Sequence, residues 1–149
     1  MEFINTDFLQ DGEIKLVLTK TADGDASRDW LPAYYFDIAD MSGEKMGWCD
    51  LRIGHNKNVY YGGNIGYTVL PQFRGHAYAK KSVELLKKLA AAHGMEYFYI
   101  TCFPENTPSK RTCENAGGAF VENAVLPEDN DMRIKDGQER VLVYRFDLI

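Results

Sequence analysis

Hydrophobic residues repeat most regularly between residues 77 and 93, where the pattern predicts an amphipathic helix. Apolar side chains recur there at intervals of three and four residues, and Gly94 follows at a position typical of a helix C-terminus. Residues 97–103 are largely apolar and aromatic, as in a buried strand. A strand predicted at residues 65–70 precedes the helix, and the strand at residues 97–103 follows it. Because a strand–helix–strand connection usually joins parallel strands, we expect the two strands to be parallel neighbours or near neighbours.

The remaining apolar runs are short and predict further strands. They lie at residues 13–18, 33–38, 46–53, 119–126 and 140–148. Turn-forming residues 41–44 join two of them as a hairpin. Residues 59–61 are expected to begin the strand that continues at 65–70, with Gly62-Gly63 as a bulge or close backbone approach.

Helices are predicted to be few. Residues 26–31 leave room for only a turn or two before Pro32, and Thr107-Pro108 begins a second helix that Gly117-Gly118 closes. The fold class is therefore α/β: a single domain over residues 1–149, with a mixed, mostly antiparallel sheet of about seven strands and flanking helices.

Composition limits the classes of ligand and partner that the protein is expected to bind. A formal net charge of -5 argues against nucleic acid and is compatible with a cationic or amine substrate. Three cysteines without C-x-x-C spacing make a disulfide framework or a zinc site unexpected. The acidic N-terminus and the lack of a run of about 18 apolar residues predict a soluble, cytoplasmic protein with no membrane partner.

The corner at residues 69–79, VLPQFRGHAYA, lies between a predicted strand and the long helix. Gly75 and the small residues around it would leave backbone N–H groups exposed at the helix N-terminus, where the helix dipole favours an anion. Such a corner suits a phosphate or pyrophosphate, although it lacks the lysine and hydroxyl of a P-loop and the three-glycine dinucleotide fingerprint. Taken alone, it is equally compatible with a tight turn that binds nothing.

Residues 72–77, QFRGHA, resemble the Q/R-x-x-G-x-G/A signature of the GNAT superfamily of N-acetyltransferases. The resemblance extends over residues 62–122 and includes Asn106, Ser109, Glu114 and Gly117 at the spacing of the family's second block. It implies acetyl-CoA as co-substrate and a central pair of parallel strands that splay apart. Residues 21–32 are too short for the two helices that the family usually places between its first two strands.

The resemblance also implies roles for individual residues. Backbone amides of one segment would bind the pyrophosphate of acetyl-CoA: Arg74, Gly75, His76, Ala77, Tyr78 and Ala79. The strand at residues 67–70 would pair with the pantetheine arm, and an N–H of Val69 or Leu70 would polarise the thioester carbonyl. Asn106, with Ser109 in the same block, is expected to contact the pantetheine arm, unless Asn106 only caps the following helix.

Two catalytic positions depart from the family pattern. Where many members have a tyrosine that protonates the leaving thiolate, this chain has Cys113, which could donate a proton or be a small buried hydrophobe. Where some members have a catalytic glutamate, this chain has Asn64, which cannot act as a base. Asp50 is the alternative base, ahead of His55, although Asp50 could equally pair with Arg52 or face solvent.

The resemblance therefore predicts an N-acetyltransferase in which a primary amine of a small molecule or peptide attacks acetyl-CoA directly in a ternary complex, without a metal. The acceptor pocket is expected to be open or completed by a second subunit of a homodimer. One alternative is a regulatory module that binds CoA or acyl-CoA without turnover, which the substitutions at Asn64 and Cys113 favour. Another is an interaction domain that has lost the ligand.

Overall fold

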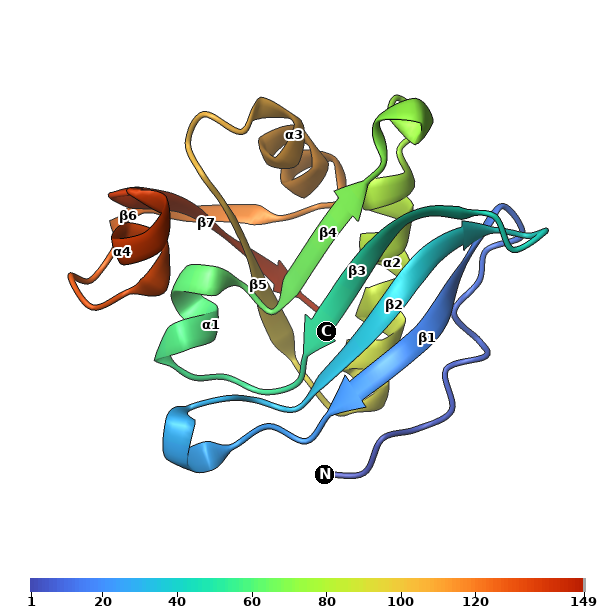
Figure 1. Ribbon diagram of the computed structural model, residues 1–149, viewed down its shortest axis with the longest axis horizontal. Helices are drawn as coiled ribbons and strands as arrows, with labels where there is room; N and C mark the ends of the chain where they lie inside the picture. The colour runs from blue at the N-terminus through green and yellow to red at the C-terminus, as the bar shows by residue number, and fades with distance from the viewer. Residues whose placement is uncertain (149) are drawn as a thin grey trace.

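The computed structural model describes residues 1–148, which form seven strands in two antiparallel sheets (Figure 1). The first sheet has the order β1 (Ile14–Ala22), β2 (Ala33–Asp40), β3 (Lys45–Arg52) and β4 (Ile65–Val69). The second has the order β5 (Tyr97–Cys102), β7 (Arg140–Asp147) and β6 (Ala119–Val125). The helices are α1 (Lys57–Gly62), α2 (Tyr78–Ala92), α3 (Thr107–Asn115) and α4 (Asp131–Asp136), with 3-10 turns at Ala26–Arg28 and Pro71–Phe73. The predicted α/β class with about seven strands is confirmed, but the strands form two antiparallel sheets where one mixed sheet was expected.

The main core lies between the first sheet and α2. Val83, Leu86 and Leu89 of α2 are fully buried and belong to the same cluster as Phe36 of β2 and Leu51 of β3. This is the apolar stripe that the sequence pattern predicts for the helix. Figure 1 shows α2 crossing behind this sheet.

The other face of the first sheet carries no helix among the described residues (Figure 1). Val17 of β1 and Trp48 of β3 lie on this face, in register with Asp37 of β2, and are 42% and 45% exposed. This face lacks a helix because the connection between β1 and β2 is short and forms only the 3-10 turn Ala26–Arg28, as predicted. This face of the sheet is thereby left without a covering helix in residues 1–148.

One predicted strand is wrong. Residues 59–61 belong to helix α1, because Asn56 caps this helix by accepting a hydrogen bond from the N–H of Val59 at 3.0 Å. Val59 is buried, and Gly63 ends the helix with a φ of +81°. The cap and the burial override the strand preference of the Val-Tyr-Tyr sequence. Helix α4, in the loop between β6 and β7, was not predicted either.

β4 and β5 lie next to each other but belong to different sheets. They meet at one end, where the N–H of Asn64 donates to the carbonyl of Tyr99 at 2.7 Å. Beyond that point β4 pairs with β3 and β5 pairs with β7, and Figure 1 shows the two strands diverging. Among the described residues, the predicted parallel neighbours therefore share no ladder of their own, and a gap opens between them.

Candidate active site

The free edge of β4 forms one wall of this gap. The N–H of Leu70 donates to Met46 of β3 at 2.8 Å, and the N–H of Arg52 donates to the carbonyl of Asn64 at 2.7 Å. Because backbone groups alternate along a strand, the N–H and C=O groups of Tyr67 and Val69 point the other way, toward the gap. The Val69 carbonyl accepts a hydrogen bond from Arg74 Nε at 3.0 Å, in agreement with this orientation.

This geometry corrects the prediction for Leu70. Its N–H is already bonded to β3 and is not available to polarise a carbonyl in the gap. Of the two amides that the sequence suggested, that of Val69 is the one that faces the gap. The alternation of strand hydrogen bonds decides this, and the sequence gives no sign of which residues face the neighbouring strand.

A pocket of about 220 Å³ occupies the gap and will be called the gap pocket. β4, β5 and the start of α3 supply most of its lining, and Gly62 and Met132 complete one end. The lining residues are Gly62, Ile65, Gly66, Tyr67, Ile100, Thr101, Cys102, Phe103, Asn106, Ser109, Met132 and Val141. None of these side chains carries a formal charge, so the pocket suits an uncharged, extended group.

Asn64 lies where β4 and β5 meet, at the closed end of the gap. Its side chain is completely buried, and Nδ2 donates to the carbonyls of Arg52 and Gly54 at 3.0 and 2.8 Å. Its Oδ1 accepts from the N–H of Tyr99 at 2.9 Å. Asn64 thus joins β3, the following loop and β5, which is a structural role that the search for a catalytic base did not anticipate.

The corner at residues 74–79 lies between the end of β4 and the start of α2, as predicted. Gly75 has a φ of +91°, and Ala77, the residue before the helix, has a φ of +61°. No side chain caps α2, whereas the other three α-helices of the described chain are each capped by an asparagine. First-turn amides of α2 are therefore not used by a side-chain cap, and the dipole there favours an anion.

The second block places its polar residues at the gap pocket. Asn106 Oδ1 accepts from the N–H of Ser109 at 3.2 Å, so Asn106 does cap α3, and both residues also line the pocket. The hydroxyl of Tyr67 lies 2.8 Å from Ser109 Oγ. The sequence analysis placed only the backbone of Tyr67 at the site, because nothing in the pattern shows that this β4 side chain reaches α3.

Cys113 lies beneath the gap pocket, completely buried, and does not line it. The hydrogen bond that it shares with Cys102 and its burial raise the pKa of the Cys113 thiol, so the thiol keeps its proton. These observations agree with the alternative that Cys113 is a small buried hydrophobe. Its role as a proton donor stays a prediction.

Asp50 forms the ion pair that the sequence left open. Its Oδ1 lies 2.9 Å from Arg52 Nη1 and 3.3 Å from the N–H of Gly66. Burial raises the pKa of Asp50, while the neighbouring Arg52 opposes the rise. Asp50 lines neither the gap pocket nor the larger pocket described next. His55, the other candidate base, stacks on Tyr97 with ring centroids 4.1 Å apart. Catalysis by Asp50 stays a prediction.

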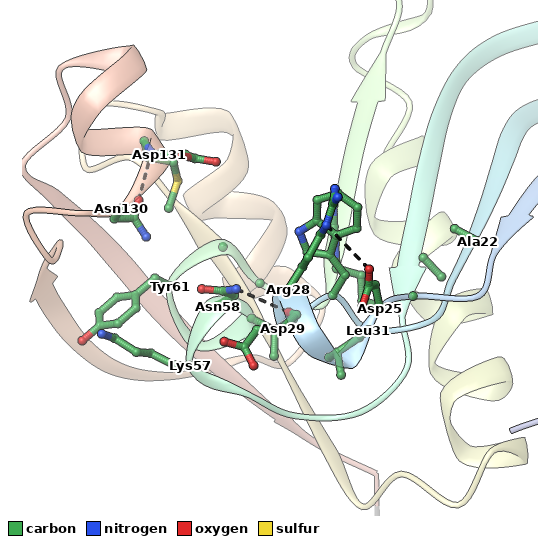
Figure 2. A pocket seen from close by; sticks show the side chains of 18 of the residues that line it. Ala22, Asp25, Arg28, Asp29, Leu31, Lys57, Asn58, Tyr61, Asn130 and Asp131 are labelled. Atoms are coloured by element: carbon green, nitrogen blue, oxygen red, sulfur yellow. Dashed lines mark hydrogen bonds and ion pairs between the residues drawn. The ribbon is translucent and has the colours of Figure 1, made fainter.

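A second, much larger pocket of about 1160 Å³ adjoins the gap pocket and will be called the wide pocket. Figure 2 shows Arg28 and Asp29 on one side of it, Asn130 and Asp131 on the other, and α1 between them. Gly62 and Met132 line both pockets, so the two pockets are neighbours. The sequence did not predict this pocket, because its walls come from loops far apart in the chain.

Carboxylates outnumber cations in the wide pocket. Its charged lining residues are Asp23, Asp25, Asp29, Asp129 and Asp131 against Arg28, Arg52 and Lys57. Arg28 pairs with Asp25 at 3.6 Å. Asp29 adopts a left-handed conformation with a φ of +57°, and its carbonyl accepts from the side chains of Asn56 and Asn58. The pocket therefore has a net negative lining that attracts a cationic ligand.

Among residues 1–148, no three side chains of the His, Cys, Asp and Glu types are grouped so that they could hold a metal ion. The same part of the chain has no helix of the length and apolarity needed to cross a membrane.

Comparison with known families assigns the chain. The family described as acetyltransferase (GNAT) domain matches residues 2–119, which is most of the sequence. The chain belongs to the GNAT acetyltransferase family. This result confirms the resemblance found in the 72–77 signature. A search of curated proteins found no match.

Solved structures of GNAT acetyltransferases share the fold. A dodecameric spermidine N-acetyltransferase from Vibrio cholerae is 10% identical with a TM-score of 0.65, and the alignment covers 93% of this chain and 95% of that one. An acetyl transferase from Salmonella typhimurium that modifies the N-terminal serine of a 50S ribosomal subunit protein is 19% identical with a TM-score of 0.60, covering 81% and 66%.

A microcin self-immunity acetyltransferase, solved with acetyl-CoA and AMP, is 18% identical with a TM-score of 0.56. The alignment covers 77% of this GNAT chain and 61% of that protein. An alignment with an acetyltransferase from Vibrio cholerae covers 64% of that second protein. The chain therefore spans less than two thirds of the length of these two proteins. At such identities the likeness shows the fold.

Proposed function

We propose that this GNAT protein is an N-acetyltransferase that transfers the acetyl group of acetyl-CoA to a primary amine. The carrying observation is that a narrow neutral pocket along the free edge of β4 lies next to a wide, negatively lined pocket. Acetyl-CoA would place its pyrophosphate at the corner of residues 74–79 and its pantetheine arm in the gap pocket. The microcin self-immunity relative that was solved with acetyl-CoA supports this choice of co-substrate.

Three features fit the gap to acetyl-CoA. The β4 backbone offers the amides of the pantetheine arm the N–H and C=O groups of Tyr67 and the N–H of Val69, which point away from β3. The amide of Val69 is the candidate donor to the thioester carbonyl as negative charge develops on its oxygen. The uncapped start of α2 offers backbone N–H groups to the pyrophosphate.

The acceptor would enter through the wide pocket and approach the thioester from the side of Gly62 and Met132, which line both pockets. The negative lining favours an amine acceptor, since its ammonium form is attracted and loses a proton before attack. The relatives named above act on spermidine and on a protein N-terminus, and both acceptor types are compatible with a pocket of this size and charge. We propose direct attack within a ternary complex in the cytoplasm.

Calorimetric titration with acetyl-CoA and with CoA tests the first half of this proposal, and micromolar binding is expected. Turnover is then measured as CoA release with two named probes, a diamine such as spermidine and a short peptide with a free N-terminal serine. Binding together with turnover of either probe supports the proposal. Binding without any turnover would favour a regulatory CoA-binding module, and absence of binding would refute a live acetyl-CoA site.

A further inference from the structure

The reaction that we propose above requires a proton on sulfur. When the amine nitrogen bonds to the acetyl carbon and the C–S bond breaks, the sulfur of CoA leaves with the electron pair. A thiol has an ordinary pKa of about 8.5, so the thiolate accepts a proton at neutral pH. A donor at the sulfur accelerates bond breaking, typically by a factor of 10² to 10⁴.

The lining of the gap pocket contains four side chains with a hydroxyl or thiol proton: Tyr67, Thr101, Cys102 and Ser109. Thr101 is already engaged, since its hydroxyl donates to the carbonyl of Tyr61 at 2.8 Å. The interaction with Cys113 lowers the pKa of the Cys102 thiol, so Cys102 is the competing donor that the variants below test. Among the two remaining hydroxyls, the phenol of Tyr67 is by far the stronger acid.

Tyr67 is held in a fixed position across the gap. It belongs to β4, the strand whose free edge faces the pantetheine arm, and its hydroxyl lies 2.8 Å from Ser109 Oγ on α3. The amide of Ser109 is in turn held by Asn106 at the start of that helix. The phenol therefore joins both walls of the pocket at the level of its polar residues.

The surroundings keep this phenol protonated. Burial, followed by the nearby thiol of Cys113, raises the pKa of Tyr67. The titratable groups that face Tyr67 are the thiols of Cys102 on β5 and Cys113 on α3, so no carboxylate or ammonium competes for its proton. The phenol therefore carries the proton that it would donate to the departing sulfur.

We propose that Tyr67 is the proton donor to the sulfur of CoA and that Ser109 positions its hydroxyl. The O–H bond of Tyr67 breaks as the S–H bond forms, the phenolate regains a proton from solvent, and the acceptor nitrogen releases one to solvent. Acetyl-CoA and the neutral amine thereby give CoA and the N-acetylated amine without a net change of charge. This inference rests on the proposed function of the gap pocket and assigns to β4 a task that the sequence suggested for Cys113.

The test compares Tyr67→Phe with Tyr97→Phe, which removes a hydroxyl from β5 outside both pockets. Turnover of acetyl-CoA is measured with spermidine and with the N-terminal serine peptide, whichever the wild type accepts. Tyr67→Phe is expected to lower kcat about 100-fold while the KM for acetyl-CoA stays within twofold. Tyr97→Phe is expected to behave as the wild type.

A binding measurement provides a readout independent of turnover. A hydrogen bond from Tyr67 stabilises the thiolate of CoA, so wild type should bind CoA more tightly than Tyr67→Phe above pH 8.5, by roughly tenfold. Acetyl-CoA carries no ionisable thiol, so its Kd should be the same for both proteins at every pH. Ser109→Ala, a second variant, should show the same effects more weakly.

Three results would overturn the inference: an unchanged kcat in Tyr67→Phe, an equal loss of acetyl-CoA binding, or a kcat defect in Cys113→Ala or Cys102→Ala that Tyr67→Phe lacks. Each presupposes a wild type that binds and turns over acetyl-CoA. If the wild type fails to do so, the proposed function fails first, and the two failures are thereby distinguished. Circular dichroism of each variant confirms that it is folded.

Discussion

The two pockets of this GNAT protein meet at Gly62 and Met132 but are built in opposite ways. The gap pocket is narrow, neutral and walled by strand backbone and the start of α3. The wide pocket is about five times larger by volume, 1160 against 220 Å³, and is walled mostly by loops and α1 with an excess of carboxylates. Strand backbone suits the pantetheine arm, which is the same in every CoA ester. Loop side chains suit a variable acceptor, because they can be substituted without disturbing the core.

The difference predicts that substitutions on the two sides act on different ligands. Changes at the corner and the gap should alter acetyl-CoA binding and leave the preference among acceptors intact. Changes in the wide pocket should alter acceptor KM and leave acetyl-CoA binding intact. The predictions below test this separation, and they begin with the largest expected effect.

Gly75→Glu is expected to weaken acetyl-CoA binding by at least 100-fold in calorimetry. The substitution places a carboxylate at the proposed pyrophosphate site and a side chain at a φ of +91°. Gly43→Glu is the matched control, because Gly43 has a φ of +97° in the turn between β2 and β3 and has equally open surroundings. Equal binding by the two variants would show that the corner is only a tight turn.

Asn64→Leu is expected to destabilise the protein by about 2–4 kcal/mol, because it leaves two carbonyls and one N–H without their buried partner. Urea unfolding measures this value. Asn123→Leu, at an exposed position on β6, should cost less than about 0.5 kcal/mol. A small effect at Asn64 would mean that the closed end of the gap does not depend on this side chain.

The parts of the fold that sequence predicts well are those set by local pattern. The periodicity of α2 and the 72–77 signature need no information from distant residues, and both placed the corner correctly. Residues 59–61 failed because the cap from Asn56 and the burial of Val59 outweigh a strand propensity.

The parts of the site that depend on distant contacts could not be read from the sequence. Asp29 and Asp131 line one pocket only because the loop after β1 and the loop after β6 face each other across α1. Likewise, the orientation of Tyr67 toward Ser109 and the engagement of the Leu70 amide follow from strand register. A strand pattern gives alternation but not the identity of the neighbour on each edge.

The acidic lining of the wide pocket should govern acceptor binding. Replacing Asp29 and Asp129 together by Asn is expected to raise the KM for spermidine about fivefold, since solvent-exposed charge pairs contribute roughly 0.2–1 kcal/mol each. The KM for acetyl-CoA should not change. Asp136→Asn, on α4 but outside the pocket, is the control. A change in acetyl-CoA KM instead would contradict the separation of the two sides.

The smallest predicted effect concerns pH and Asp50, which touches β4 from the side away from the gap. Burial raises the folded-state pKa of Asp50 above its ordinary value of 3.8, so the folded protein favours the protonated carboxyl. The contribution of Asp50 to the free energy of unfolding is therefore fully present below pH 3.8. It declines as the pH rises through the folded-state pKa and the buried group becomes charged. Asp50→Asn removes this decline, and Asn can still accept the hydrogen bond from Gly66. The unfolding free energy of the variant relative to wild type should therefore increase between about pH 3.5 and neutrality.

Arg52→Gln sharpens this prediction, because it acts in the opposite direction. Arg52 opposes the rise in the Asp50 pKa, so its removal raises that pKa further and makes the loss of stability with pH steeper than in wild type. Urea unfolding at a series of pH values measures both slopes. Parallel curves for wild type and Asp50→Asn would show that Asp50 is not penalised by burial. An Asp50 carboxylate with an ordinary pKa would be a weak base at neutral pH, so the same result would count against Asp50 as the catalytic base, and Asp50→Asn should then leave turnover unchanged.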